Sequence, residues 1–193
     1  MIGLLLLFII VVLVFFAIGA YNKLVSLRNQ VQNAWKQIDV QLKRRHDLIP
    51  NLINTVKGAM GFERETLEAV VAARNTAIAA SNSGNVAAIA PAETQLTGAL
   101  SRLLAVVEAY PDLKATGNVA QLQEELTATE NKIGFARQLY NDTATQYNTA
   151  QQTFPMMLFA GMAGAALVPL WEITDEGERA VPQVDLSLGP PKK

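Results

Sequence analysis

The sequence predicts an all-α protein in which an N-terminal transmembrane helix continues into a long antiparallel four-helix bundle. Three observations support this prediction. Residues 2–20 contain no charged residue and no proline. Apolar residues then recur at steps of three and four, the spacing of a helix with one buried stripe. Runs of β-branched residues with the period of two that strands show are missing.

Composition limits the class of protein further. A chain of 193 residues suits one domain with a sizeable core. Half of the residues are hydrophobic and only 17% are charged, which is unusual for a soluble protein. A net charge of −1 provides no basic excess to neutralise phosphates, so we expect no nucleic-acid partner. The lack of cysteine excludes disulfides, thiolate nucleophiles and thiolate metal sites.

Residues 2–20 have the length of a membrane span. As a helix they rise about 28 Å, close to the ~30 Å thickness of the hydrocarbon core. A buried core helix rarely runs this far without a polar face. A cleaved signal peptide, for which Ala17 and Gly19 would suit the cleavage site, normally has a preceding basic residue and a shorter apolar run. We therefore expect lipid contact along this helix, with the following residues as its anchor: Leu4, Leu7, Val11, Val14 and Phe15.

Charge predicts the orientation of this span. Lys23, Arg28 and Lys36 follow it closely, whereas only the α-amino group precedes it. The positive-inside rule then places the N-terminus outside and the C-terminal domain in the cytoplasm.

The remaining chain divides into helices at turn-forming stretches. The first helix is expected to run unbroken from residue 2 to 57, and the others to cover residues 63–80, 86–110 and 119–153. The breaks are "KGAMGF", "SNSGN" and "YPDLKATGN". The predicted organisation is a transmembrane helix at 1–20, a bundle at 21–153, an apolar segment at 154–171 and a tail at 172–193 that is acidic and then Pro-rich.

The last long helix has a strict heptad pattern. Its apolar positions alternate by four and three, which predicts a coiled-coil-like packing seam. Asn131, Asn141 and Asn148 recur beside this seam, and setting the register within the bundle is favoured over an exposed seam for a partner. The predicted seam residues are Leu122, Leu126, Ile133, Tyr140, Tyr147 and Phe154.

A basic cluster lies within the first predicted helix. The stretch "QLKRRHDLIPNL" (residues 41–52) includes Lys43, Arg44, Arg45, His46 and Pro50. Pro50 has no N–H for the carbonyl of His46 and its ring crowds that carbonyl, so a bend at 46–50 is expected. A break is not expected, since apolar spacing resumes at Ile49.

The cluster lies about 35 Å beyond the membrane span along a continuous helix. Because the Debye length is only about 8–10 Å, lipid headgroups are not its expected partners. We expect carboxylates on the second or fourth helix, or on a neighbouring subunit, and we expect His46 to be a polar residue of the surface or an interface.

The segment 154–171 is free of charge and has three interpretations. In the first, the segment packs on the bundle. In the second, it contacts a membrane surface or a neighbouring subunit. In the third, it spans the bilayer a second time. Its length of 18 residues nearly suffices for a span, but prolines lie near both ends and small residues interrupt its middle.

Two long stretches resemble the LemA family. They are "YNKLVSLRNQVQNAWKQIDVQLKRRHDLIPNLINTVKG" and "EAYPDLKATGNVAQLQEELTATENKIGFARQLYNDTATQYNTAQQTFP". The resemblance implies a bacterial single-pass protein of the inner (cytoplasmic) membrane, with a cytoplasmic helical domain and no known enzymatic activity. It also implies possible links to a membrane-bound zinc protease or to magnetosome-membrane formation, as in some relatives. The chain departs from the family at "AMGFERE", where a His-Glu pair is usual, and at "LFAGMAGAALVPLWE", which replaces a Gly-Phe-Lys stretch.

Candidate catalytic or metal-binding residues are scarce. His46 is the only histidine, and no Glu stands three residues before it, so neither a di-iron nor a zinc site can be assembled in the usual way. We therefore expect no catalytic, cofactor or metal site and no small-molecule substrate. The predicted function is a non-enzymatic membrane-anchored scaffold that homo-oligomerises and organises membrane or envelope components, with lipid and further copies as partners. The alternative is a regulatory adaptor for a membrane-bound zinc protease.

Overall fold

The computed structural model describes residues 1–57, 63–110 and 117–172, and within these ranges the chain is helical with no strand. The elements are α1 (Ile2–Lys57), α2 (Arg64–Ser83), α3 (Val86–Glu108), α5 (Gly117–Gln152) and the single turn α6 (Met157–Ala160). The all-α prediction is confirmed. The predicted breaks at 58–62 and 111–116 and the tail at 173–193 lie outside the described residues.

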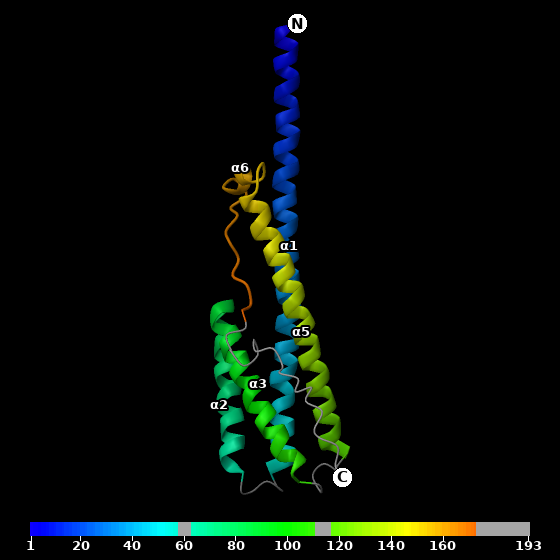
Figure 1. The fold of residues 1–193 in the computed structure, drawn as a ribbon, viewed down its shortest axis with the longest axis vertical. Coiled ribbons are helices and arrows are strands. Elements are labelled where there is room, and N and C mark those ends of the chain that lie inside the picture. Colours follow the sequence, from blue (N-terminus) through cyan, green and yellow to red (C-terminus); the bar gives the residue numbers. More distant parts are fainter. Residues whose placement is uncertain (58–62, 111–116, 173–193) are drawn as a thin grey trace, which may run out of the picture.

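Helix α1 connects the apolar end of the molecule to the bundle. Its 56 residues form one continuous helix about 84 Å long. Its N-terminal part projects beyond all the other helices, while α5 runs antiparallel beside the remainder (Figure 1). Residues 1–19 are exposed except for half-buried Ala17, and burial begins at Ala20. One helix therefore has an apolar, uncovered N-terminal part and a longer packed part.

The bundle has an upper and a lower core. In the upper core, α1 residues from Leu24 to Leu42 pack on α5 residues from Ile133 to Tyr147, with the start of α3 alongside. In the lower core, α1 residues from Ile49 to Val56 pack on α2, α3 and the first turns of α5. Because the α2–α3 hairpin is short, four helices surround only the lower part (Figure 1).

The turn between α2 and α3 follows its sequence chemistry. Gly84 adopts a left-handed conformation (φ +66°) that closes α2. The side chain of Asn85 then accepts a hydrogen bond of 3.0 Å from the Ala87 N–H and caps α3. Helix α2 continues to Ser83, beyond the expected end at residue 80, because the glycine rather than the first serine terminates it.

Pro50 lies within α1 without breaking it. The carbonyl of His46, which would bond the N–H of residue 50 in a regular helix, instead accepts a hydrogen bond of 2.7 Å from Nε of Arg74 on α2. The group freed by the proline thus becomes a contact between α1 and α2.

The chain after α5 turns at α6 and returns along the bundle. We call residues 165–171 the strap; they form no helix and descend beside α5 (Figure 1). This path rules out a second membrane span, one of the three interpretations of residues 154–171, because the segment doubles back after a single helical turn.

Two asparagines hold the strap through its backbone. Asn148 donates to the Val168 carbonyl (2.8 Å) and accepts from the Val168 N–H (2.9 Å). Asn141 makes the same pair of bonds with Trp171, at 3.0 and 2.8 Å. Seven helical residues rise about 10.5 Å, and three extended residues span about 10 Å, so the two repeats match. These asparagines therefore set the register of the strap, whereas the sequence suggested register between helices.

The strap ends in a buried aromatic contact. Trp171 is buried, with its ring centroid 6.1 Å from that of Trp35 on α1 and with the Arg137 guanidinium 5.8 Å from its centroid. The hydroxyl of Tyr140 donates to the Pro169 carbonyl at 2.7 Å. The strap therefore forms part of the upper core.

Replacing Asn148 with Ala should release the strap. The substitution leaves the N–H and carbonyl of Val168 without their partner, a cost of about 1–3 kcal/mol. Hydrogen–deuterium exchange should show faster exchange at Val168 in the variant. Asn131→Ala, at an exposed position on the same helix, is the matched control. Unchanged protection in the Asn148 variant would contradict this role.

Candidate functional site

A cluster of charged and polar side chains lies inside the bundle between its two cores. We call it the polar layer; its members are Arg45 and His46 of α1, Glu93 and Thr97 of α3, and Glu130 of α5. Arg45 is only 1% exposed. A buried guanidinium requires partners, because an uncompensated charge in a protein interior is strongly destabilising.

The Arg45 guanidinium supplies the centre of the polar layer. It forms ion pairs with the carboxylates of Glu93 and Glu130, which lie on different helices. Its Nη1 also donates a hydrogen bond of 2.9 Å to the hydroxyl of Thr97. One side chain therefore connects α1 to both α3 and α5.

His46 completes the layer and is not a surface residue. It is 6% exposed, and its Nε2 lies 2.9 Å from Oε1 of Glu93. The expectation of a polar surface or interface position was wrong, because the adjacent residues Arg45 and His46 share Glu93 as a partner on α3 and are both covered by it.

The charge state of Glu93 follows from these contacts. Burial acts to raise the pKa of the Glu93 carboxyl. The hydrogen bond with His46 and the charge of Arg45 act in the opposite direction and outweigh burial, so the pKa lies below its ordinary value. Glu93 is therefore ionised at neutral pH and neutralises Arg45.

The heptad pattern contained a signal for this layer. Buried positions on α1 step through Leu42, Arg45 and Ile49, so Arg45 occupies a position that apolar residues fill elsewhere. On α3, Glu93 stands in the same way between Ile89 and Leu96. Each appears in the sequence as a gap in an apolar stripe. Two oppositely charged residues in such gaps indicate a buried pair when their helices pack together.

The other residues of the basic cluster lie outside the layer. Lys43 is exposed, and Arg44 is half-exposed with an ion pair of 3.6 Å to Glu125 of α5. Of the carboxylates that meet the cluster, Glu125 and Glu130 lie on the fourth long helix, one of the two expected locations. Glu93 lies on α3, which was not expected.

The layer offers little for chemistry on a ligand. Its carboxylates already face Arg45, and Glu93 is closed off from solvent. Among residues 1–57, 63–110 and 117–172, no group of three His, Asp or Glu side chains could hold a metal ion. The geometry is that of a buried set of ion pairs and hydrogen bonds that connects the helices.

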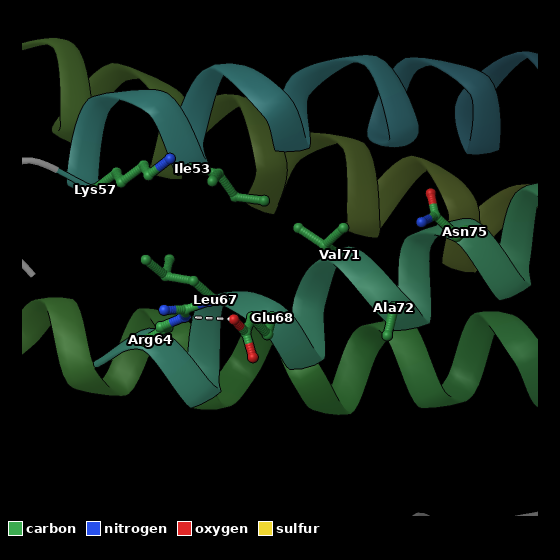
Figure 2. Close-up of a pocket in the computed structure, with 8 residues that line it drawn as sticks. All are labelled: Ile53, Lys57, Arg64, Leu67, Glu68, Val71, Ala72 and Asn75. Carbon is green, nitrogen blue, oxygen red and sulfur yellow. Dashed lines mark hydrogen bonds and ion pairs between the residues drawn. The ribbon is translucent and has the colours of Figure 1, made fainter. Parts of the chain in front are cut away.

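A groove with a volume of about 710 Å³ lies between the end of α1 and α2. Ile53 and Lys57 line one wall, and Leu67 and Val71 belong to the other (Figure 2). Arg64 and Glu68 bond each other at 2.6 Å on the α2 side, as Figure 2 shows. Their charges are thus mutually compensated, and the groove presents mainly apolar contacts.

The predicted anchor residues form an uncovered apolar surface. Leu4, Leu7, Val11, Val14 and Phe15 are all exposed on the projecting part of α1. In the part of the chain that the structure describes, α1 is the one helix long and apolar enough to cross a membrane. No described element of the chain covers these side chains, and an uncovered apolar surface of this kind suits lipid.

The predicted packing seam is buried along most of its length. Leu126, Ile133, Tyr140 and Tyr147 lie in the cores, and Leu122 is half-buried. Phe154 is 76% exposed, so its assignment to the seam was wrong. The reason is that α5 ends at Gln152, and Phe154 no longer follows the helical register.

These features define an all-helical protein with an apolar N-terminal helix that continues into a bundle. The chain belongs to the LemA family, whose family model matches residues 34–186. It is 30% identical over 142 residues to Protein LemA of Metamycoplasma hominis, a match that covers 72% of this chain and 63% of that protein.

More distant relatives are named as magnetosome proteins. The chain is 22% identical to magnetosome protein MamQ of Magnetospirillum gryphiswaldense, over 88% of this chain and 72% of the relative. It is 23% identical to magnetosome protein MamQ 2 of Paramagnetospirillum magneticum, over 75% and 61% respectively. The chain thus spans less than two thirds of the LemA and MamQ 2 relatives. None of these names denotes an enzyme.

Adjacent arginines provide a matched test of the polar layer. Arg45→Gln leaves buried Glu93 without its main partner, and breaking a buried ion pair costs about 3–5 kcal/mol. Arg44→Gln removes a surface pair, which contributes about 1 kcal/mol or less. Chemical unfolding of the full-length protein in detergent should show a much larger loss of stability for the Arg45 variant. Equal losses would contradict the assignment.

Proposed function

We propose that this protein is a non-enzymatic membrane-anchored scaffold whose copies associate and organise membrane or envelope components. The observation that supports this proposal is the continuity of α1, whose N-terminal part is apolar and uncovered and whose remainder contributes to the packed core. A continuous helix transmits its orientation in the bilayer to the bundle. Such a design holds a surface at a fixed place relative to a membrane, which is a scaffold's task.

The proposed topology has the N-terminus outside and the bundle in the cytoplasm, at the bacterial inner membrane. Lys23, Arg28 and Lys36 lie on the bundle side of the apolar segment, and the positive-inside rule favours that side as cytoplasmic. The family resemblance points to the same topology.

An apolar face on the side of α1 and α5 is the proposed contact between copies. Val40, Phe135 and Leu139 are exposed there around a hollow of about 490 Å³. Lys36 and Lys132 line the same hollow. Because anchoring confines copies to a plane and aligns their α1 helices, a lateral face of this kind meets its neighbours at high effective concentration. Like charges on this face favour a partner surface other than itself, hence a head-to-tail contact that builds rings or filaments.

The mass of the full-length protein in lipid nanodiscs or mild detergent tests the proposal. We expect particles larger than a monomer. Phe135→Asp should weaken association by about 30-fold, as the loss of a central aromatic contact worth about 2 kcal/mol does. The matched control is Val71→Asp, at an exposed apolar position on α2.

Two results would contradict the scaffold. One is a monomer at all accessible concentrations, which would favour the regulatory adaptor of a membrane-bound zinc protease. The other is an equal effect of the Phe135 and Val71 substitutions, which would remove the proposed face.

A further inference from the structure

The turn between α5 and the strap presents bulky apolar side chains to its surroundings. We call residues 154–164 the apolar turn. Phe154, Met157, Leu158 and Met162 are all exposed, with Met162 at 78%. No charged residue occurs between residues 153 and 171. A contiguous uncharged patch of this kind marks an interaction site rather than an ordinary water-facing surface.

The position of the turn along α1 indicates what covers it. The ring of Phe159 lies 6.2 Å from that of Phe16, near the inner end of the charge-free segment. A hollow of about 210 Å³ there is lined by Phe159 and Met162 together with Ala17, Ile18 and Tyr21 of α1. Figure 1 shows α6 beside α1 below the projecting apolar part. The turn is therefore level with the point where the apolar segment ends and polar sequence begins.

The turn is built into the fold. Within it, the Ala163 N–H bonds the Phe159 carbonyl at 3.0 Å and the Ala165 N–H bonds the Ala160 carbonyl at 2.9 Å. Gly164 takes a left-handed conformation (φ +57°) that lets the chain reverse. Beyond the reversal, Asn148 holds Val168 by two hydrogen bonds. The exposed side chains are thus presented at a fixed height.

We propose that the apolar turn inserts into the headgroup boundary of the bilayer that α1 crosses, on the side of the bundle. This inference rests on the proposed anchoring by residues 2–20. The turn reverses after too few residues to span a bilayer, which needs about 20, but its side chains suit a depth of about 5–10 Å into the interface. A spanning helix alone can tilt in the bilayer toward any side and carry the packed bundle with it. A second contact beside it fixes which face of the bundle meets the membrane.

The lack of cysteine makes a direct depth measurement possible. Three single-cysteine variants of the full-length protein, each labelled with a solvent-sensitive fluorophore, are reconstituted in vesicles of phosphatidylcholine and phosphatidylglycerol. Met162→Cys reports on the apolar turn, Phe8→Cys on the spanning segment and Ala69→Cys on an exposed site of α2 far from the membrane. All three positions are exposed, so the label has space at each.

We expect blue-shifted emission from labels at 162 and 8, and water-like emission at 69. A quencher attached near the lipid headgroup should reduce the signal at 162 more than one at the end of the acyl chain. The signal at 8 should show the opposite preference.

Three outcomes would overturn the inference and separate its failure from that of the proposed anchoring. A buried label at 8 with a water-exposed label at 162 would refute insertion while anchoring stands. Water-like emission from the labels at both 162 and 8 would refute insertion of the turn and anchoring by α1 together. A blue-shifted label at 162 that no lipid quencher reaches would show that protein, such as a second copy, covers the turn instead.

Discussion

The pairing of buried Arg45 with Glu93 and Glu130 is the constraint on which the arrangement of α1, α3 and α5 depends. Apolar side chains resist a shift of one helix along another less strictly than charges do, since hydrophobic burial has no preferred direction. A buried guanidinium has to meet its carboxylates to offset a desolvation penalty of several kcal/mol. Moving a helix by one turn, about 5.4 Å, would leave the charges unpaired. The polar layer thus favours the register in which α1, α3 and α5 bring these charges together.

The register of α5 against α1 determines which residues lie beside the apolar N-terminal segment of α1. Helix α5 leaves the layer at Glu130 and continues antiparallel to α1 as far as Gln152. Its length brings the following turn to Phe16 at the base of the apolar segment. The strap then returns along α5 and ends at Trp171 against Trp35, within the upper core. Contacts deep in the bundle and the placement of apolar side chains beside the anchor are therefore parts of one alignment.

Sequence periodicity predicted the helices and the unbroken course of α1 through Pro50, because a stripe at steps of three and four survives a single proline. It missed the polar layer, since Arg45 and Glu93 look like interruptions when each helix is considered alone. Their pairing spans 48 positions and depends on how α1 and α3 pack. Packing of the C-terminal segment on the bundle was one of its expected interpretations, but the path and register of the strap were not predicted, for another reason. Its contacts run from asparagine side chains to backbone groups, and no repeating pattern of strap residues signals such bonds.

A double-mutant cycle between Arg45 and Glu93 tests the central claim most directly. Free energies of unfolding are compared for Arg45→Gln, Glu93→Gln, the double variant and the unaltered full-length protein in detergent. Arg45→Gln leaves buried Glu93 without its arginine partner, and Glu93→Gln leaves buried Arg45 with Glu130 as its one remaining carboxylate partner. The double variant removes the charges of both residue 45 and residue 93. We predict that the double variant loses less stability than the sum of the single losses, with a coupling at or above the upper end of the roughly 0.5–3 kcal/mol seen for contacting residues. Additive losses would show that the two residues do not depend on each other and would contradict the account.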